Sequence, residues 1–492
     1  MEKCVKINAK DNVAVALCDL NKGEEYLGVT LAENIPCGHK FALENICNGS
    51  DVIKYGNPIG FARQNIAAGQ HVHCHNLATH LAERFDYVYK PQSEKNTSFA
   101  ENLNVNVFVR CDGKVGIRNE LWVLPLVGCV NGQARQIAAE FKARHSDLHG
   151  IDGVFAFTHP YGCSQVGEDH VRTRTLLQRL ATHPNAGGVL VLGLGCENNT
   201  MQQFVDTIGD YDKNRVKFLV AQDVDDEIKV GVDLLEQLYA VARNDVRTQA
   251  DLSCLKIGLK CGGSDGLSGI TANPLVGLVA DKIAQCGGTV IMTEVPEMFG
   301  AEQLLMNRAA DKQVYEKIVK LICNFKQYYA DNNQPCYENP SPGNKAGGIT
   351  TLEDKSLGCT QKSGSTSVND VLFDGQRATV DGLNLLNGPG NDMVAVTNLA
   401  TAGCQLVLFT TGRGTPFGGI VPTVKISTNS ALAQKKRNWI DFDAGKIVDG
   451  ASFEQTADEL LRFVVETVNG KHTANERSNS RDIAIFKTGV TL

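Results

Sequence analysis

Hydrophobic residues downstream of about residue 107 occur in short uninterrupted runs, separated by stretches in which apolar positions follow helical spacing. The runs span residues 121–127, 153–157, 189–192, 217–220, 255–259, 289–292 and 405–409. The amphipathic stretches between them include 133–144, 168–182, 225–243 and 301–328. Uninterrupted apolar strands with intervening helices are typical of parallel sheets covered on both faces. The pattern therefore predicts α/β lobes with mainly parallel sheets.

The first ninety residues follow another pattern, in which short β segments alternate with glycine and asparagine turns and no long helix is evident. Residues 13–17, 51–56 and 71–73 are predicted as strands, which indicates a small all-β module. The polar residues that follow this module have the composition of a linker. The predicted domain order is a β-module at 1–90, a linker at 91–106, an α/β lobe at 107–250 and a second α/β lobe at 251–492 with a loop-rich insertion at 331–384.

Length, charge and cysteine content narrow the class of protein. A chain of 492 residues exceeds a single core, so several domains are expected. A net charge of -7 without a basic run argues against nucleic-acid binding. The sequence has no signal peptide and no 18-residue apolar segment, so we expect a cytoplasmic protein without a membrane span. The sixteen cysteines include no Cys-x-x-Cys pair, which favours reduced thiols over a disulfide framework.

Three of the eleven histidines lie in the segment His-Val-His-Cys-His-Asn at residues 71–76. Alternation along an extended strand would place His71, His73 and His75 on one face. Imidazoles with a shared direction could bind a divalent metal or an anionic substrate. The alternative is a surface strand that happens to be rich in histidine. We favour the functional interpretation, with His71 and His73 as metal ligands and His75 as a substrate contact.

Small loops bearing glycine, cysteine, serine or histidine follow five of the predicted strands. These loops lie at residues 128–131, 158–165, 193–199, 260–266 and 410–416. Ligands of open α/β sheets bind outside the carboxyl ends of the strands, so we expect the loops to converge on one site. Any single loop could be only a tight turn. Asn198 at the third glycine position weakens a dinucleotide fingerprint, and the loop at 262–269 lacks the Gly-Lys-Ser/Thr ending of a nucleotide-binding P-loop.

These observations favour metal-assisted chemistry on a small anion. Thiolate and imidazole ligands suit iron or zinc, and an added carboxylate suits iron(II) or manganese(II). The predicted metal ligands are His71, His73, Cys163, Cys196, Glu197, Cys261 and Cys359. We expect the β-module to fold over the strand ends, so that its histidines lie beside Cys163, Cys196 and Glu197.

Eight short motifs, taken in order, resemble those of the altronate and galactarate dehydratase family. They are DNVAVA at 11–16, GHKFAL at 38–43, VIKYGNPIG at 52–60, HVH at 71–73, YGCS at 161–164, GCENN at 195–199, KCGGSD at 260–265 and GRGTP at 412–416. The resemblance covers essentially the full chain, and residues 1–90 are similar to the SAF domain that opens these enzymes. It implies a hydro-lyase that converts D-altronate to 2-dehydro-3-deoxy-D-gluconate, stimulated by iron(II) or manganese(II). We also expect a homo-oligomer, a dimer.

Such a dehydration removes the C2 proton of a 2,3-dihydroxy acid and expels its C3 hydroxyl. The candidate bases are His170, His159, Lys260 and Lys362, which the sequence does not rank. Arg413 suits bidentate binding of the substrate carboxylate, although a lone arginine on a turn could face solvent. The predicted substrate loop consists of Gly262, Gly263, Ser264 and Asp265, whose backbone N–H groups could bind a carboxylate.

Three alternatives stay open. The first is a related lyase acting on galactarate or eliminating sulfite from sulfolactate. The second is a non-catalytic sugar-acid-binding protein, which would not need five such loops. The third is an iron–sulfur hydratase, whose cluster would be held by Cys163, Cys196 and either Cys359 or Cys261.

Overall fold

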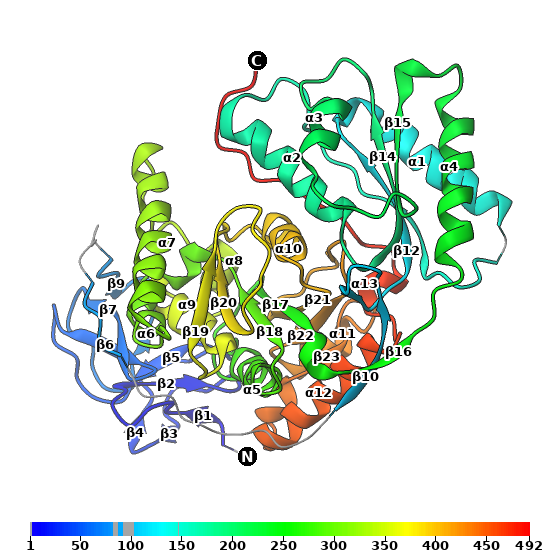
Figure 1. The fold of residues 1–492 in the computed structure, drawn as a ribbon. Helices are drawn as coiled ribbons and strands as arrows, with labels where there is room; N and C mark the ends of the chain where they lie inside the picture. Colours follow the sequence, from blue (N-terminus) through cyan, green and yellow to red (C-terminus); the bar gives the residue numbers. More distant parts are fainter. Residues whose placement is uncertain (1, 82–86, 92–102, 146) are drawn as a thin grey trace.

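The computed structural model describes residues 2–81, 87–91, 103–145 and 147–492. Figure 1 shows three parts in a row: the N-terminal β-module in blue, the C-terminal α/β lobe beside it, and the middle α/β lobe at the far end. The order along the chain therefore differs from the order in space, because the C-terminal lobe lies between the other two. The predicted class, a β-module followed by α/β lobes with mainly parallel sheets, is confirmed.

The β-module is built entirely from short antiparallel strands. One sheet has the order β1-β2-β5-β8, a second has the order β6-β7-β9, and β3 and β4 form a hairpin. The strands are β1 Cys4–Val5, β2 Val13–Ala16, β3 Glu25–Tyr26, β4 Val29–Thr30, β5 Lys40–Ala42, β6 Asp51–Lys54, β7 Asn57–Ala62, β8 His71–Val72 and β9 Leu77–Ala78. Positive-φ glycines such as Gly23, Gly49 and Gly69 permit the tight turns between them.

The middle lobe is a parallel sheet with the order β13-β12-β14-β15. Its strands are β12 Glu120–Pro125, β13 Gly153–Ala156, β14 Ala186–Gly193 and β15 Val216–Val220, and its helices are α1 Asn131–Arg144, α2 Gly167–Ala181, α3 Met201–Thr207 and α4 Glu227–Ala242. Helices α1 and α4 share one apolar core with the sheet, and α2 packs on the opposite face. Both faces of the sheet are therefore covered, as the apolar runs predict.

The C-terminal lobe contains a seven-stranded sheet, all parallel, with the order β19-β20-β18-β17-β21-β22-β23. Its strands are β17 Lys256–Cys261, β18 Thr289–Met292, β19 Val368–Leu372, β20 Gly382–Leu386, β21 Leu406–Thr411, β22 Thr423–Ser427 and β23 Phe442–Asp443. Its helices are α5 Ala272–Gln285, α6 Glu302–Met306, α7 Lys312–Asp331, α8 Pro342–Ala346, α9 Leu352–Cys359, α10 Asp392–Thr401, α11 Ser430–Lys435, α12 Phe453–Val468 and α13 Ala474–Arg477.

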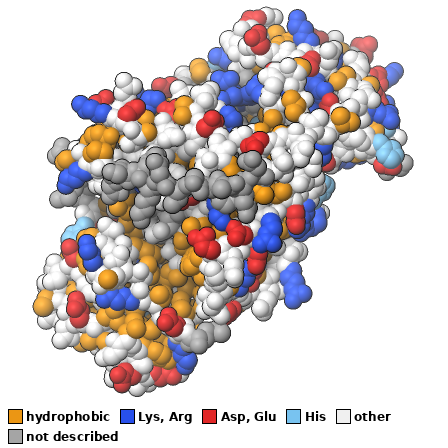
Figure 2. Space-filling view, turned by 60° about the horizontal axis from the view of Figure 1, so that its bottom comes forward, with side chains coloured by type: hydrophobic (Ala, Val, Ile, Leu, Met, Phe, Trp, Pro, Cys, Tyr) orange, Lys and Arg blue, Asp and Glu red, His pale blue; other side chains and the backbone are white. Residues whose placement is uncertain are grey.

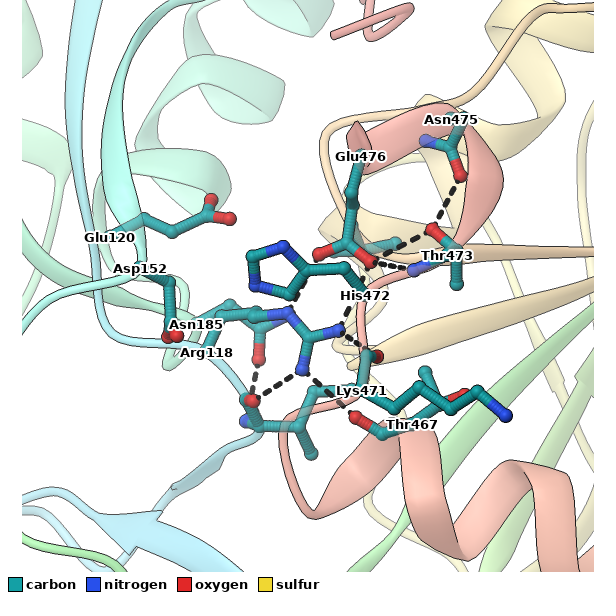
Figure 3. Close-up of polar contacts among 12 residues, drawn as sticks. Arg118, Glu120, Asp152, Asn185, Thr467, Lys471, His472, Thr473, Asn475 and Glu476 are labelled. Carbon is teal, nitrogen blue, oxygen red and sulfur yellow. Dashed lines mark hydrogen bonds and ion pairs between the residues drawn. The ribbon is translucent and has the colours of Figure 1, made fainter. Parts of the chain in front are cut away.

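A small antiparallel sheet, β11-β10-β16, joins the two lobes through β10 Asn104–Val109, β11 Val115–Gly116 and β16 Thr248–Asp251. The lobes also share an apolar core that contains Trp122 of β12 and Phe409 of β21. Figure 3 shows a polar part of this junction, where the buried Arg118 contacts Glu476 and the backbone carbonyls of Thr467 and Lys471. The two lobes are thus held by both apolar and charged contacts.

The β-module is anchored on α9 of the C-terminal lobe. Lys40 Nζ and Lys54 Nζ, both buried, each lie 3.0 Å from a carboxylate oxygen of Asp354. A Cβ at Gly266 would overlap the carbonyl group of Gly38, so the two backbones approach more closely than a side chain would allow.

On the face drawn in Figure 2, lysine and arginine side chains are interspersed with acidic ones.

Several local predictions differ from the structure. The stretch 301–328 is two helices, because the Asp311 side chain accepts from Val314 N and starts α7 anew. The segment 331–384, predicted as loop-rich, contains α8, α9 and β19, elements too short to give a clear periodic signal. Strand β10 begins at Asn104, inside the predicted linker, of which residues 92–102 lie outside the described part. Among the described residues, no helix is long and apolar enough to cross a membrane.

Candidate functional site

A cluster of charged and thiol side chains lies buried at the carboxyl ends of β17 and β18. These strands are neighbours in register, with Lys256 opposite Thr289, so their ends meet at one edge of the sheet. Two cluster residues end β17, two follow β18, and three come from α9 and the 3-10 turn after it. They are Lys260, Cys261, Glu294, Glu297, Lys355, Cys359 and Lys362, all buried, and we call them the lysine–thiol cluster.

Glu294 pairs with two lysines of this cluster. One oxygen of its carboxylate accepts from Lys260 Nζ, and the other lies 2.9 Å from Lys362 Nζ. Burial acts to lower the pKa of both lysines, but the charges around them outweigh it and raise the pKa well above the ordinary range. Both lysines are therefore ammonium ions at neutral pH. Glu294 has φ of 73°, a strained conformation that often marks a functional position.

The two thiols of the cluster meet at Glu297. Cys261 Sγ and Cys359 Sγ are 3.3 Å apart, and each lies 3.1 Å from the same Glu297 oxygen. Lys362 Nζ is 3.1 Å from Cys261 Sγ, and Lys355 Nζ donates to the other Glu297 oxygen at 2.7 Å. The hydrogen bond with Cys261, together with burial, raises the pKa of the Cys359 thiol. In the described part of the chain, only Cys261, Glu297 and Cys359 bring three metal-ligand atoms within 4.8 Å of one another.

The cluster opens toward solvent at Asp392, the first residue of α10. Its side chain is 34% exposed, and one carboxylate oxygen lies 2.9 Å from Lys260 Nζ. A Cβ at Gly262 would lie 2.7 Å from both Asp392 oxygens, so only glycine leaves room for this carboxylate. The exposed Arg413 lies beside the next residue, Gly263, where a Cβ would be 3.6 Å from Arg413 Cβ. Asp392 and Arg413 thus flank the loop after β17 at the open side.

The remaining residues of the predicted substrate loop are engaged within the fold. Ser264 is buried, and its carbonyl accepts from Asn344 Nδ2 at 2.8 Å. Asp265 accepts from the side chains of Thr428 and Asn429, and burial raises the pKa of its carboxyl. Asp265 therefore ties the loop to the residues after β22. Gly262 is buried and its N–H donates to Thr410 O, which leaves the exposed Gly263 as the loop backbone at the open side.

Four histidines form a second cluster on the β-module. Its members are His39, His71, His73 and His75, with neighbouring ring centroids 5.0–5.7 Å apart. Strand β8 ends at Val72, and a turn, in which His73 O accepts from Asn76 N, brings the later rings back toward His71. The predicted convergence of His71, His73 and His75 is present, produced by this turn and not by strand alternation.

The histidine cluster faces the C-terminal lobe. His39 Nδ1 and His71 Nε2 are 2.9 Å apart, and His73 Nε2 lies 2.9 Å from Lys345 O in α8. Burial and the neighbouring rings lower the pKa of His71 to about 3, and burial lowers that of His73 to about 4. These imidazoles are therefore neutral at neutral pH, and one nitrogen lone pair accepts the hydrogen bond between His39 and His71.

Two short helices connect the clusters. Asp354, which pairs with Lys40 and Lys54 of the β-module, directly precedes Lys355 of the lysine–thiol cluster on α9. On α8, Asn344 Oδ1 lies 3.4 Å from Lys355 Nζ, and the next residue, Lys345, presents its carbonyl to His73. The clusters thus lie on two sides of one pair of helices.

The structure does not bring the predicted ligands of the middle lobe to either cluster. Cys163 and Cys196 are exposed on the loops after β13 and β14, and Glu197 accepts from the backbone of its own loop at Leu194 and Gly195. These loops contact each other, since Asn199 N donates to Gly162 O, but they belong to a separate sheet. The ligand role of these three residues stays a prediction without geometric support.

The two histidines predicted as bases lie in the same lobe. His159 is buried, with Nε2 2.8 Å from Pro125 O and Nδ1 accepting from Tyr161 N, so both of its nitrogens hold the loop after β13. Burial lowers its pKa to about 4. His170 lies on α2, with Nε2 3.3 Å from Gln203 Oε1. Neither is close to the residues gathered at β17 and β18.

Several site residues were missed from the sequence. Glu294 and Glu297 follow β18 in the segment Thr-Glu-Val-Pro-Glu, which has no glycine or cysteine to mark it. Lys355 and Asp392 lie at helix positions that look like ordinary charged surface. His39 precedes β5, which pairs with β8 so that Phe41 opposes His71. The motif GHKFAL contains His39, but only strand pairing shows that it joins the other histidines.

Both clusters contain side chains that can ligate a metal ion. The Cys261–Glu297–Cys359 group is compatible with a metal ion, because thiolate and carboxylate are common ligands. Lysine ammonium groups already contact Glu297 and Cys261 there and would repel a cation. The histidine cluster offers neutral imidazoles with no lysine ammonium hydrogen-bonded to its ring nitrogens in the described chain. Its imidazole nitrogens suit a divalent cation by chemistry, whereas among the described residues only the Cys261–Glu297–Cys359 group meets the geometric requirement of three ligand atoms within 4.8 Å.

Family models match almost the whole chain in three consecutive parts. Residues 2–80 match the altronate/galactarate dehydratase SAF domain, residues 107–243 the second domain of D-galactarate dehydratase/altronate hydrolase, and residues 252–491 the C-terminal D-galactarate/altronate dehydratase domain.

Curated relatives share the full length of the chain. An altronate dehydratase of Escherichia coli (strain K12) is 57% identical and covers 99% of both chains. An altronate dehydratase of Bacillus subtilis (strain 168) is 50% identical over 100% of both chains. A galactarate dehydratase (L-threo-forming) of Escherichia coli is 32% identical, over 95% of this chain and 93% of its own.

Proposed function

The chain belongs to the D-galactarate/altronate dehydratase family, and on that basis we propose that this hydro-lyase dehydrates D-altronate to 2-dehydro-3-deoxy-D-gluconate. The observation that carries the choice of substrate is the identity of 57% and 50% to two altronate dehydratases over the full length, against 32% to a galactarate dehydratase. The buried charges at the carboxyl ends of β17 and β18 supply a place for the chemistry.

The chain's own residues suit the charge changes of this reaction. The C2 proton passes to a base, an acid protonates the C3 hydroxyl so that it leaves as water, and the resulting enol becomes the ketone. We expect Arg413, at the open side, to bind the substrate carboxylate through two parallel hydrogen bonds. Negative charge develops on that carboxylate as the proton leaves, and the ammonium of Lys260 next to Asp392 would stabilise it.

Lys260 and Lys362 are better suited to this electrostatic role than to that of a base. A lysine must be neutral to take a proton, and the Glu294 carboxylate holds both of them charged. We infer that a carboxylate takes the C2 proton, and Asp392 is the one at the open side with an exposed part. It is the first residue of α10, and its carboxylate lies beside the Lys260 ammonium.

We propose that a divalent cation, iron(II) or manganese(II), is held by His39, His71, His73 and His75. When bound, it would supply Lewis-acid polarisation of a substrate oxygen. Imidazole nitrogen is a suitable ligand for iron, and the lowered pKa values of His71 and His73 favour metal binding at neutral pH. An iron–sulfur cluster is the alternative for the thiols, and a colourless active enzyme would exclude it.

The decisive experiment is a keto-acid assay on D-altronate, galactarate and sulfolactate, with purified protein before and after chelation. We expect turnover of altronate to exceed that of the other two, to vanish on chelation and to return with iron(II) or manganese(II). Preferred turnover of galactarate or sulfolactate would replace the proposed substrate. Full activity of metal-free protein would remove the cation.

Two further expectations concern the protein in the cell. We infer a cytoplasmic enzyme, because the chain carries a metabolic dehydratase sequence over its whole length. We also infer a homodimer, which sedimentation velocity of the purified protein would test. A single species at the monomer mass of 53.2 kDa would contradict it.

A further inference from the structure

A second buried lysine lies on the other side of the Phe409 ring from Lys260. Lys425 is in the middle of β22 and is fully buried. In the register of the sheet, Lys260 opposes Phe409 and Phe409 opposes Lys425, so the three side chains form a row across β17, β21 and β22. The Phe409 ring lies 5.5 Å from Lys260 Nζ and 4.9 Å from Lys425 Nζ. Cation–π contact with one ring thus joins the two ammonium groups.

The partners of the two lysines differ. Lys260 Nζ pairs with Glu294 and Asp392, whereas Lys425 Nζ donates to two backbone carbonyls, those of Thr415 at 3.1 Å and of Phe417. No carboxylate among the described residues lies within ion-pair distance of Lys425. A buried ammonium of this kind is rare unless it has a task.

The carbonyls that Lys425 binds belong to the loop that carries Arg413. This loop leaves β21 at Thr411, turns through Gly414 at φ of 84°, and is tied at its start because Arg413 N donates to Gly263 O at 2.9 Å. Lys425 ties its other end. The guanidinium of Arg413 is exposed, so its direction depends on how firmly the loop backbone is held.

We propose that Lys425 is a positioning residue whose ammonium holds the 412–417 loop and thereby sets Arg413 for substrate binding. The inference rests on the proposed role of Arg413 as the carboxylate-binding group. Neutral Lys425 would lose its charge-assisted hydrogen bonds to the two carbonyls, and the loop would loosen. Substrate affinity should then depend on the protonation of a residue that never touches the substrate.

The groups around Lys425 define the pH at which this occurs. Burial lowers the pKa of Lys425 to about 8, against the opposing effect of the Asp441 and Asp392 carboxylates. Asp441, after α11, accepts from Lys425 N at 2.9 Å, and burial raises its pKa to about 6. Lys260 across the Phe409 ring stays charged. Because a lysine is charged below its pKa, the loop is held below about pH 8 and loosens above it.

Steady-state kinetics between pH 6.5 and 9.5 test the inference. For the natural protein we expect KM to rise roughly tenfold or more across the alkaline range while kcat changes little. Lys425→Met should show the high KM at every pH. Lys425→Arg, whose guanidinium stays charged, should keep the low KM to the top of the range. The matched control is Lys256→Met, a half-buried lysine at the other end of β17 that donates to Ala378 O and should retain the natural profile.

Amide hydrogen exchange of residues 412–417 gives a readout that needs no turnover. After correction for intrinsic rates, exchange of these amides should speed up above pH 8 in the natural protein and at all pH values in Lys425→Met. If exchange behaves so but KM does not, the role proposed for Arg413 fails and the role of Lys425 in the loop stands. Unchanged loop exchange in Lys425→Met, or an alkaline rise in KM that persists in Lys425→Arg, would overturn the inference.

Discussion

At the scale of single residues, the site depends on how buried charges are paired. Glu294 is central, because its two oxygens contact Lys260 and Lys362 and it also accepts from Cys261 N at 3.0 Å. Removing one partner of a buried ion pair leaves the other charge uncompensated, which costs more than a surface pair is worth. The arrangement also orients the ammonium groups before substrate arrives, so little reorganisation is needed during the reaction.

We therefore predict that Glu294→Gln lowers kcat by roughly 100-fold or more, because the two lysines lose their shared counter-ion and their orientation. The matched control is Glu302→Gln, which removes one partner of a buried pair with Lys326 elsewhere in the same lobe. Both variants should lower the melting temperature, but only Glu294→Gln should lose turnover. Equal loss of kcat in both would reduce the role of Glu294 to stability.

We expect His73→Ala to abolish metal-dependent turnover and to reduce bound metal. Altering a residue that only supports a metal ligand costs roughly 10–100-fold in metal affinity or activity, and removing the ligand itself should cost more. His80→Ala is the control, because His80 pairs with Asp51 on the module surface, outside the histidine cluster. Metal content by elemental analysis and kcat decide the matter. Wild-type values for both in His73→Ala would leave the cluster without a role in metal binding.

At the scale of elements, the apolar runs predicted the strands that are long and covered on both faces. The run 289–292 coincides with β18, and 217–220 lies within β15. The short edge strand β23 was missed, because two residues carry no periodic signal, and so was β22, whose central Lys425 interrupts the apolar pattern. The rule that loops after parallel strands share one edge of the sheet correctly predicted that Lys260, Cys261 and Arg413 lie at the same edge. The same rule failed for Cys163 and Cys196 because it cannot tell which of two sheets a strand joins.

Helix α9 illustrates how an element without a strong sequence signal can organise the site. It is buried along its whole length and carries Asp354 toward the β-module and Lys355 and Cys359 toward the lysine–thiol cluster. Its start is fixed by the Thr351 side chain, which accepts from Asp354 N. An apolar core helix would be easier to detect, but this one is polar because it binds charged groups on both sides.

Asp354→Asn should destabilise the protein by about 3–5 kcal/mol, because Lys40 and Lys54 would both lose their only carboxylate partner among the described residues. The charges of these lysines, against the effect of burial, hold the pKa of Asp354 far below 3.8. The natural protein should therefore lose this contribution as the pH falls below 3.8, and the variant should not. Melting temperatures from pH 6 down to pH 3 measure the difference, and parallel curves for the two proteins would contradict it.

At the scale of the whole molecule, the C-terminal lobe determines the assembly of the chain. The β-module docks on α9 of this lobe, and the middle lobe packs against another part of it through a shared apolar core. Both contacts join residues far apart in the chain, so local sequence does not show them. The sequence does separate the β-module from the α/β lobes, because the pattern of apolar positions changes between them, but the two lobes share one pattern. The contacts between the parts depend on ion pairs between buried residues that lie far apart in the sequence, such as Arg481 with Glu120 and Arg118 with Glu476.

The junction between the two lobes yields a pH-dependent prediction for the whole molecule. Arg118 donates to both oxygens of Glu476, and Figure 3 shows this pair enclosed between the lobes. Burial opposes the charged form, but the Arg118 charge outweighs it and lowers the pKa of Glu476 from 4.5 to about 2. A carboxyl with a depressed pKa stabilises the fold above its unfolded pKa and loses that contribution as the pH falls, here between about 4.5 and 2.

Glu476→Gln should therefore remove about 3 kcal/mol of stability at pH 7 and flatten the loss of stability below pH 4.5, since each pKa unit is worth about 1.4 kcal/mol. Because the pair joins two lobes, the variant should also separate their unfolding into two calorimetric transitions where the natural protein shows one. Glu466→Gln on the exposed surface of α12, where the carboxylate contacts Lys471, is the control and should leave both features unchanged. A single transition in Glu476→Gln with the natural pH dependence would show that the apolar core around Trp122 and Phe409 couples the lobes without the ion pair.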